Sequence, residues 1–572
     1  MKPWWERFPG RLEFELDELR EQGIEVRQDE KAFAAGSVIL ELWFPTDEGE
    51  VVHLTAHYPD TYPYTRFEVK APDLALGRHM GVFEKNLCLL GQATDNWNTN
   101  STLFRVLEKE LSTVLMTGRS DDIEAVRHLE ENQADPESVY YTPQKDTIIL
   151  IDGAWAIDSR KEQGEFTVGI AKNSTSLIRG AVLEIRDETG ESLIPSNQVF
   201  ESYYPERLQG RWVRVDSLPR KHNALEFLEE LSIQHPALKK ARWNNNVKGG
   251  AVDLIGVLFP EELDYRKKSD SWLFIVRAQS PSFGIGKEIG YFARTGRAGQ
   301  TDLSARVPEV ASITSRKVAV VGLGGVGWPA ALELARNGVG ELRVLDHDVV
   351  EPGTTVRWGF GFTAVGRHKT AVIREFINSN YPYTNVIDFD HRLGSGLNPA
   401  GLDSTILSEL FDGVELMYDA SAEVGIQHLL SDLATEFGIP YICASTRQGA
   451  WGGEVARIHP ARTAGCWNCL QESFADGTIP TPPGDPAGML QPAGCASPTF
   501  TGTSFDIQEV SLFAIRLAMS ALTEGVADGY PKADWDVGIL SLRTTKEELA
   551  APRWDTFVLT KHPKCPCKNK VP

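Results

Sequence analysis

The sequence has no long apolar run. No segment approaches the ~20 consecutive apolar residues that cross a bilayer, and residues 2–23 lack the apolar centre of a secretory signal. Hydrophobic residues make up 42% of the chain and charged residues 24%, which is the balance of an ordinary globular protein. We therefore expect a cytoplasmic protein that does not have a membrane as a partner.

Basic residues and cysteines are also scarce. The chain has 58 Lys and Arg against 79 Asp and Glu, which gives a formal net charge of −21. Because nucleic acids bind clustered Lys and Arg, this balance argues against a nucleic-acid partner. The seven cysteines are an odd number in a chain without a secretory signal. They argue against a disulfide framework and favour thiols that bind metal or react.

A length of 572 residues excludes a single hydrophobic core and predicts an α/β multidomain protein. Short β-rich runs followed by a helical pattern predict a compact α+β domain over residues 1–118. The polar stretch 119–145 predicts a linker, and 146–300 is a mixed segment without recognisable chemistry. Alternating strand and helix patterns over 301–572 predict a doubly wound, Rossmann-like α/β domain.

A glycine-rich turn lies near the start of this last domain. The stretch VAVVGLGGVG at 318–327 predicts a buried strand that ends in glycines, and a helical pattern follows it. Gly322, Gly324 and Gly327 match G-x-G-x-x-G, a pattern whose backbone amides can face phosphate. Asp346 lies 346 − 327 = 19 residues after the last glycine, where a ribose hydroxyl is expected. The pattern predicts a nucleotide site but does not distinguish a nicotinamide dinucleotide from ATP.

Two pairs of cysteines have the spacing of metal ligands. Cys466 and Cys469 form C-x-x-C, and Cys565 and Cys567 lie close together near residue 572. Together they suit a tetrahedral Zn²⁺ site that ties the end of the chain to its domain. His562 is an alternative to one of the sulfurs, and two unrelated thiol pairs are the alternative to a metal site.

The other three cysteines differ in their surroundings. Cys443 lies in an apolar predicted strand, where a thiol usually behaves as a small hydrophobe. Cys495 follows the Pro/Gly-rich run 476–494, a predicted mobile loop, and precedes a helical pattern that starts at Phe505. A position near a helix N-terminus favours a reactive thiolate. Cys88 lies in a short polar-flanked segment, and we expect Cys88 and Cys495 to react.

Several motifs resemble those of ubiquitin-like conjugation. VGLGGVG, DHDVVEPGTTVR, GRHKTA, YDAS and GCASPTFTGTSFD resemble the ThiF-type, ubiquitin-activating adenylation domain over roughly residues 300–567. YPDTYPYTRFEVKAP, LCLL and DNWNTNSTL resemble a ubiquitin-conjugating domain over roughly residues 10–115. Their order resembles that of bacterial fusions in antiphage operons. Among these are the ubiquitin-transferase-like proteins of CBASS systems, which attach a cyclic-nucleotide synthase through its C-terminus to target lysines.

The resemblance implies that the nucleotide is ATP, used with Mg²⁺. The residues that would hold ATP and stabilise charge on its phosphates are Gly322, Gly324, Gly325, Gly327, Asp346, Asp348, Thr354, Arg357, Lys369 and Asp419. Thr354 stands where the family usually has Asn. Many members carry a second Asp shortly after the position of Asp419. This chain has Glu423 near that position instead, so the Mg²⁺ ligand is left open. The family's His-Pro-Asn is missing before Cys88, where His79 and Asn86 are the candidates for the oxyanion stabiliser.

The resemblance also implies a relay of three steps. A partner's C-terminal carboxylate is adenylated, Cys495 attacks to form a thioester, and Cys88 accepts the acyl group and delivers it to a target lysine. The partner would be a cyclic-nucleotide synthase or a ubiquitin-like protein. Related adenylation domains form homodimers, and some supply an Arg across the dimer, for which Arg306 and then Arg294 are candidates.

Three other classes of protein remain open at this stage. An NAD-dependent oxidoreductase would use the glycine turn and Asp346 but leaves Cys88 and the cysteine pairs without a role. A sulfur-carrier adenylyltransferase would use the last domain alone. A non-catalytic nucleotide-binding scaffold would fit the departures at Thr354 and after Asp419.

Overall fold

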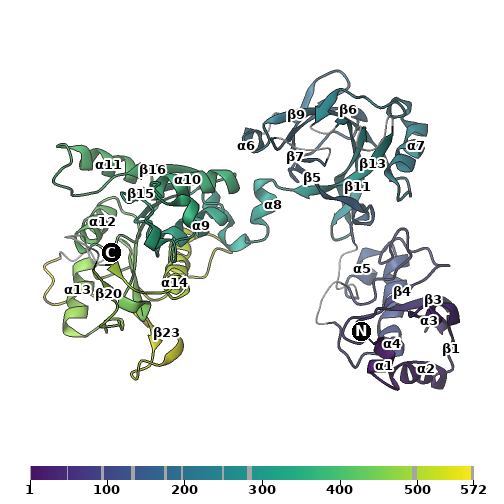
Figure 1. Cartoon of the computed structure of the whole chain (residues 1–572), viewed down its shortest axis with the longest axis horizontal. Coiled ribbons are helices and arrows are strands. Elements are labelled where there is room, and N and C mark those ends of the chain that lie inside the picture. Colours follow the sequence, from purple (N-terminus) through teal and green to yellow (C-terminus); the bar gives the residue numbers. More distant parts are fainter. Residues whose placement is uncertain are drawn as a thin grey trace. The chain divides into compact units, whose positions relative to one another are not determined.

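The computed structural model describes residues 2–47, 49–91, 96–129, 135–172, 177–194, 198–247, 250–279, 287–491 and 499–567. The predicted thioester cysteine, Cys495, lies outside the described residues. The chain forms two compact units (Figure 1). The first unit comprises Met1–Ile151 and Trp155–Gly296, and the second comprises Asp152–Ala154 and Arg297–Pro572.

The first unit begins with a four-stranded antiparallel sheet in the order β1-β2-β3-β4. Alternate residues of β2 and β3, such as Leu40 and Leu54, are buried in one core with Leu107 and Leu111 of the long helix α4. The elements are α1 (Trp4–Arg7), α2 (Arg11–Glu21), β1 (Glu25–Gln28), α3 (Glu30–Ala34), β2 (Val38–Pro45), β3 (Val51–Tyr58), β4 (Glu68–Lys70), α4 (Leu103–Arg119), α5 (Ile123–Val126) and the 3₁₀ turn η1 (Glu137–Tyr140). This part has the predicted α+β composition, while its likeness to a ubiquitin-conjugating domain stays a prediction.

The rest of the first unit is a mixed sheet that closes on itself. Its strand order is β10-β11-β12-β13-β5-β7-β6-β9, and β9 also pairs in parallel with β11. The ring encloses an aromatic core that includes Phe166, Trp272 and Phe274. A Cβ on Gly210 would stand 2.3 Å from the Phe166 ring, so this strand needs glycine there. The elements are β5 (Pro143–Ile151), β6 (Gln163–Ile170), β7 (Arg179–Asp187), β8 (Ser192–Ile194), α6 (Gln198–Glu201), β9 (Glu206–Arg214), α7 (Ala224–Gln234), η2 (Pro236–Leu238), β10 (Asn245–Val247), β11 (Gly250–Asp264), β12 (Lys267–Gln279) and β13 (Glu288–Arg297).

The second unit is built on an eight-stranded sheet in the order β16-β15-β14-β17-β18-β19-β22-β23. The first five strands are parallel and the last three join antiparallel. The elements are α8 (Gln300–Ser304), η4 (Pro308–Ser315), β14 (Lys317–Val321), α9 (Gly327–Arg336), β15 (Glu341–Asp346), η5 (Pro352–Thr354), η6 (Phe362–Ala364), α10 (Lys369–Asn380), β16 (Asn385–Asp390), α11 (Leu402–Phe411), β17 (Leu416–Asp419), α12 (Val424–Glu436), β18 (Tyr441–Thr446), η7 (Gln448–Ala450), β19 (Gly452–Ile458), α13 (Trp467–Asp476), β20 (Met489–Leu490), β21 (Thr499–Phe500), α14 (Ser504–Leu522), β22 (Val537–Arg543) and β23 (Leu549–Phe557).

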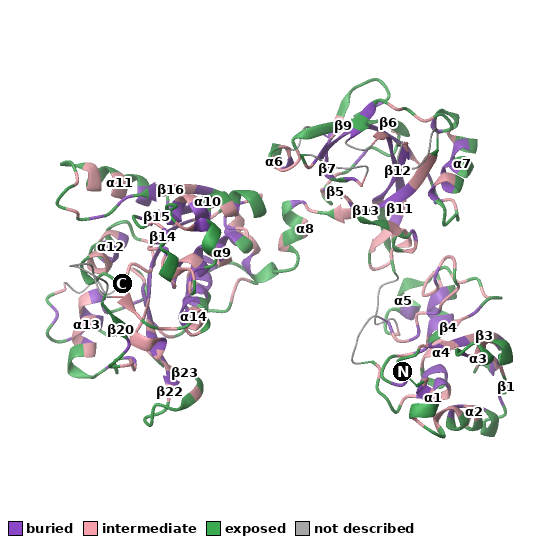
Figure 2. Cartoon of the chain, viewed as in Figure 1, coloured by how far each residue is buried: buried purple, intermediate pink, exposed green. Residues whose placement is uncertain are grey.

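Helices cover both faces of this sheet, as the prediction of a doubly wound domain requires. Val318 and Val320 pack in a core with α9, α10 and α14, whereas Ala319 and Val321 pack in a second core with α11, α12 and α13. Figure 2 shows the buried residues concentrated along the strands between these helices. Because β15 and β17 lie on opposite sides of β14, the chain reverses its direction across the sheet there. Ligands bind such folds in the crevice at the carboxyl ends of these strands.

The predicted linker at 119–145 contains α5 and η1, and β5 already begins at Pro143. Among the described residues, no helix combines the length and the apolar composition that a membrane crossing requires.

Candidate active site

The glycines of the turn after β14 have different surroundings. Gly322 has a φ of +82°, and a Cβ there would stand 2.6 Å from the Ala420 carbonyl oxygen. A Cβ on Gly327 would stand 1.8 Å from the Gly322 carbonyl oxygen. Both glycines are therefore required by the fold. A Cβ on Gly324 would meet nothing within 4 Å, yet Gly324 lines a cavity of about 650 Å³. The fold leaves the space beside Gly324 open to a ligand.

Asp346, the last residue of β15, and Asp348, two residues later, line the same cavity and lie close to Lys369. The Asp346 carboxylate, 7% exposed, accepts hydrogen bonds from the Leu323 amide at 2.6 Å and the Asp348 amide at 2.8 Å. Lys369 Nζ donates to Asp348 Oδ2 at 2.7 Å and lies 3.9 Å from Asp346 Oδ2. Burial alone would raise the pKa of Asp348. The hydrogen bond and the charge of Lys369 lower this pKa by a larger amount, so it lies below its usual value. These contacts fix the ammonium group at the cavity wall.

Arg357 lines the cavity and holds the strand β21 beside it. Its guanidinium donates to the Phe500 carbonyl oxygen at 2.5 Å and to Thr499 Oγ1 at 2.6 Å, and lies 5.3 Å from the Phe500 ring. Burial lowers the pKa of Arg357. β21 pairs with β20, and Cys495 lies between these two strands in the sequence. Arg357 thus connects the cavity to β21.

The two acidic candidates after β17 lie in different environments. Asp419 is fully buried, and its carboxylate accepts hydrogen bonds from Tyr441 Oη and the Ser421 amide, both at 2.8 Å. Burial raises the pKa of Asp419 above its usual value, although these hydrogen bonds oppose the shift. Asp419 does not line the cavity, whereas Glu423 is exposed and does. A cation in the cavity would therefore meet Glu423 rather than Asp419.

Thr354 and Arg306 also lie away from the cavity lining. Thr354 Oγ1 donates to the Glu351 carbonyl oxygen at 2.8 Å. Arg306 is exposed in the turn after α8. The ATP contact predicted for Thr354 and the action of Arg306 across a dimer stay predictions.

Two cavity residues were not indicated by the sequence. Arg392 follows β16, and its positive charge contributes to the lowered pKa of Asp348. Thr446 ends β18, and within the described chain its buried Oγ1 has no hydrogen-bond partner. A buried hydroxyl without a partner is uncommon and is consistent with a ligand at this position. Both residues stand at the carboxyl ends of parallel strands, so the crevice rule applied to these strands could have found them.

The four cysteines predicted to bind metal lie together in the second unit. The Sγ–Sγ distances are 3.7 Å for Cys466–Cys469, 3.6 Å for Cys466–Cys565 and 3.6 Å for Cys469–Cys567. All four sulfurs lie within 4.8 Å of one another. A tetrahedron with Zn–S bonds of ~2.3 Å has edges of ~3.8 Å, so the cluster fits zinc. His562 instead binds Asp476 through Nε2 at 2.8 Å.

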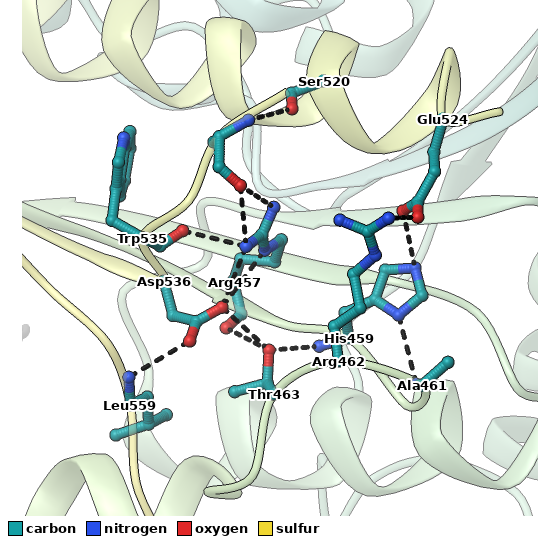
Figure 3. A network of polar contacts seen from close by, with 11 residues as sticks. Arg457, His459, Ala461, Arg462, Thr463, Ser520, Glu524, Trp535, Asp536 and Leu559 are labelled. Carbon is teal, nitrogen blue, oxygen red and sulfur yellow. Dashed lines mark hydrogen bonds and ion pairs between the residues drawn. The ribbon is translucent and has the colours of Figure 1, made fainter. Parts of the chain in front are cut away.

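A buried ion pair connects the segments that carry these cysteines (Figure 3). Arg457 Nη2 lies 3.0 Å from Asp536 Oδ1, and both side chains are about 5% exposed. Asp536 also accepts hydrogen bonds from Thr463 Oγ1 at 3.0 Å and from the Leu559 amide at 3.1 Å. Thr463 precedes the first cysteine pair and Leu559 precedes the second. The carboxylate of Asp536 therefore binds both chain segments that lead to the cysteine cluster.

The two remaining described cysteines differ in burial, while the predicted reactivity of Cys88 stays a prediction. Cys443 in β18 is 4% exposed, and burial raises the pKa of its thiol well above the usual value. Cys88 is half-buried in the first unit at a separate cavity of about 540 Å³. Its amide donates to the His79 carbonyl oxygen at 2.8 Å. Burial, followed by the charge of Asp135, raises the pKa of the Cys88 thiol.

Comparisons with known proteins match the C-terminal part of the chain and, for one relative, almost its whole length. A model described as the ThiF family matches residues 300–503. The uncharacterized protein y4oA of Sinorhizobium fredii is 30% identical over 608 residues, which cover 99% of this chain and 97% of y4oA. Adenylyltransferase and sulfurtransferase UBA4 of Saccharomyces cerevisiae is 28% identical over 193 residues, 34% of this chain and 40% of UBA4. A crystal structure of Escherichia coli MccB with ATP aligns at 15% identity and a TM-score of 0.33 over 46% of this chain and 68% of that chain.

Proposed function

Because the chain belongs to the family of y4oA and carries a ThiF-family adenylyltransferase domain in its C-terminal part, we propose that it adenylates a partner protein's C-terminus with ATP. The observation that carries this proposal is the cavity at the carboxyl ends of β14, β15 and β17. Its open wall at Gly324 faces the fixed ammonium group of Lys369 and the guanidinium group of Arg357 across one space of about 650 Å³. This combination suits a polyphosphate.

The donor set fits ATP in more than one respect. α9 begins at Gly327 beside the cavity, and a helix N-terminus favours phosphate through its free amides and its dipole. Asp346 lines the cavity and would bind a ribose hydroxyl, and the Thr446 hydroxyl, which has no partner among the described residues, would offer a further contact. Mg²⁺ prefers carboxylate oxygens and would be held by Asp348 and Glu423, where it would neutralise charge on the phosphates.

The proposed reaction is the attack of a carboxylate on phosphorus. A C-terminal carboxylate oxygen of the partner forms a bond to the α-phosphorus, and the bond from that phosphorus to the bridging oxygen breaks to release pyrophosphate. Negative charge increases on the phosphate oxygens in the transition state. Arg357 and Lys369 stabilise this charge because they are already positioned by Thr499, Phe500 and Asp348.

The finer proposal is a relay through two cysteines. Cys495 takes the acyl group from the adenylate as a thioester, Cys88 accepts it by exchange and transfers it to a target lysine. Two observations support this proposal: Arg357 at the nucleotide cavity binds β21, the strand that follows Cys495 in the sequence, and Cys88 borders its own cavity. In this proposal zinc binds the four clustered cysteines, and a homodimer forms through the second unit with Arg306 acting across it. The partner is a cyclic-nucleotide synthase in antiphage defence or a ubiquitin-like protein.

A second candidate function follows from the similarity to UBA4, whose name includes sulfurtransferase. A sulfur-carrier adenylyltransferase would activate a C-terminus in the same cavity but would have no use for Cys88. The oxidoreductase alternative explains neither the fixed Lys369 nor the position of Arg357. A non-catalytic scaffold would bind ATP without releasing pyrophosphate.

Two measurements test the proposal. The full chain should bind ATP with Mg²⁺, and it should exchange labelled pyrophosphate into ATP when C-terminal peptides of candidate partners are added. The genes beside this one supply the candidates. Tight binding of NADH, with no ATP binding and no pyrophosphate exchange, would contradict the proposal and favour an NAD-dependent oxidoreductase.

A further inference from the structure

The cavity beside Cys88 is not formed by the N-terminal sheet domain alone. Asp135, Tyr140 and Thr142 of the segment before β5 line it, and so does His222 of the closed-sheet part. The Ser138 amide donates to Glu261 Oε1 at 2.6 Å, and Tyr141 Oη donates to the Pro219 carbonyl oxygen at 3.0 Å. These bonds fix the segment 135–142 against the closed sheet. The middle of the chain therefore supplies one wall of the cavity that holds Cys88.

Asp135 is the carboxylate of this wall that has no cationic partner. Two other charged lining residues are already engaged: Arg66 Nη1 donates to the Gly91 carbonyl oxygen at 2.6 Å, and Glu84 accepts from Lys70 Nζ at 2.7 Å. No ion pair within the described part of the chain involves Asp135. Burial, the charges of Asp135 and Cys88, and a hydrogen bond to Asp135 raise the pKa of Tyr140 to about 12. Tyr140 therefore stays protonated and directs its hydroxyl hydrogen to Asp135.

Asn86 adds an unused acceptor to the same cavity. Its Nδ2 donates to Glu68 Oε2 at 3.4 Å, which directs the amide nitrogen to the carboxylate. The buried Oδ1 has no hydrogen-bond partner among the described residues. Because buried acceptors are almost always satisfied, this oxygen is consistent with a ligand that donates hydrogen bonds. Cys88, Asp135 and Asn86 thus surround a space with acceptors and a thiol.

We propose that this space is the acceptor-amine site, in which Asp135 and Asn86 Oδ1 receive a lysine ammonium group next to an acyl group on Cys88. The inference rests on the proposed function of Cys88 and gives the middle of the chain a role in it. The ammonium group loses one proton to Asp135, which releases it to solvent. The amine then forms a C–N bond to the thioester carbon, the C–S bond breaks, and a second proton from nitrogen neutralises the Cys88 thiolate.

This arrangement favours transfer of the acyl group from Cys88 to the amine, which we call discharge. It disfavours transfer of the acyl group onto Cys88, which we call loading. A carboxylate beside the thiol disfavours the thiolate that must attack an incoming thioester, in agreement with the raised pKa of Cys88. The same carboxylate attracts a cationic acceptor and removes its proton. Replacing Asp135 by Asn should therefore change the two half-reactions in opposite directions, which a purely structural role would not do.

The test uses the full chain with a synthetic peptide thioester ending in glycine, which loads Cys88 without the adenylation step. Discharge is then measured with free lysine, which is cationic, and with hydroxylamine, which is uncharged at neutral pH. Asp135→Asn should slow discharge to lysine about a hundredfold, which is the scale of a positioned general base. The rate of discharge to hydroxylamine should stay within about twofold of that of the unchanged chain. Tyr140→Phe should give a smaller loss with the same preference. The matched control is Asp121→Asn, an exposed residue of the same linker that does not line the cavity.

A second readout requires no acyl group. Alkylation of Cys88 by iodoacetamide, followed by mass spectrometry of its peptide, should reach half-maximal rate at lower pH in Asp135→Asn than in the unchanged chain. Equal discharge to lysine in Asp135→Asn and Asp121→Asn would overturn the acceptor site and leave the relay standing. Failure of the peptide thioester to load Cys88 in any variant would overturn the transfer step itself.

Discussion

Replacement of Gly324 by Ala should separate ligand binding from folding at the turn after β14. A Cβ on Gly324 meets nothing within 4 Å, so the methyl group costs the fold nothing. Ala should even stabilise the turn slightly, since it restricts the unfolded chain. The methyl group would occupy the space in which a phosphate oxygen must approach to about 2.9 Å of a backbone amide. Loss of one such charge-assisted hydrogen bond costs about 1.5–3 kcal/mol, which corresponds to about a ten- to hundredfold weaker Kd for ATP.

Two other glycines provide the controls for this prediction. Gly396→Ala adds a methyl group to an exposed position that is equally open, and it should change neither ATP binding nor thermal unfolding. Gly327→Ala should unfold the domain, because its Cβ would stand 1.8 Å from a carbonyl oxygen. Calorimetric titration with ATP and thermal denaturation measure both properties. Equal ATP affinity in Gly324→Ala and Gly396→Ala would refute the assignment of this space to phosphate.

Three further predictions concern charge, metal and thiols. Lys369→Ala should lower ATP–pyrophosphate exchange about a hundredfold, the scale of one positioned charge-stabilising donor; exchange within threefold of the unchanged chain would contradict its role. Asp536→Asn leaves the buried Arg457 charge uncompensated and should lower the free energy of unfolding in urea by about 3–5 kcal/mol. It should also speed the release of zinc to a chelator. A purified protein that contains no zinc would contradict the metal prediction. Cys88→Ala should leave a reducible thioester on Cys495 and abolish transfer to lysine, whereas Cys495→Ala should leave neither cysteine loaded; loading of Cys88 in the second variant would refute the order.

Local regularity explains what the sequence predicts well. The apolar run Val318–Val321 and the helical spacing after it predict elements that the structure contains as β14 and α9. Asp346 was predicted to end the next strand, and it does. The two cysteine pairs were placed together from spacing alone, because four thiols near one domain end suit one tetrahedral ion. In each case the signal lies within a few residues of the element it predicts.

Residues brought together by long-range pairing were not predicted. Arg392 and Thr446 carry no motif, and only the order of the parallel strands places them at the cavity. Asp135 lies in a polar linker 47 residues after Cys88 by sequence number, 135 − 88, and reaches the same cavity through its contacts with the closed sheet. The closure of that sheet depends on the parallel pairing of β9 with β11, which no local pattern indicates.

The charge balance of the nucleotide cavity supports a role for a divalent cation. Among its described lining residues the carboxylates and the Lys and Arg groups are equal in number: Asp346, Asp348 and Glu423 against Arg357, Lys369 and Arg392. A triphosphate therefore enters a site whose side-chain charges already cancel and adds a large negative excess. The buried Asp419 does not line the cavity, and its oxygens accept hydrogen bonds from Tyr441 and the Ser421 amide. The Mg²⁺ that we propose would contact the exposed carboxylate of Glu423 and the phosphates together and would offset this charge, as it does in phosphoryl transfer.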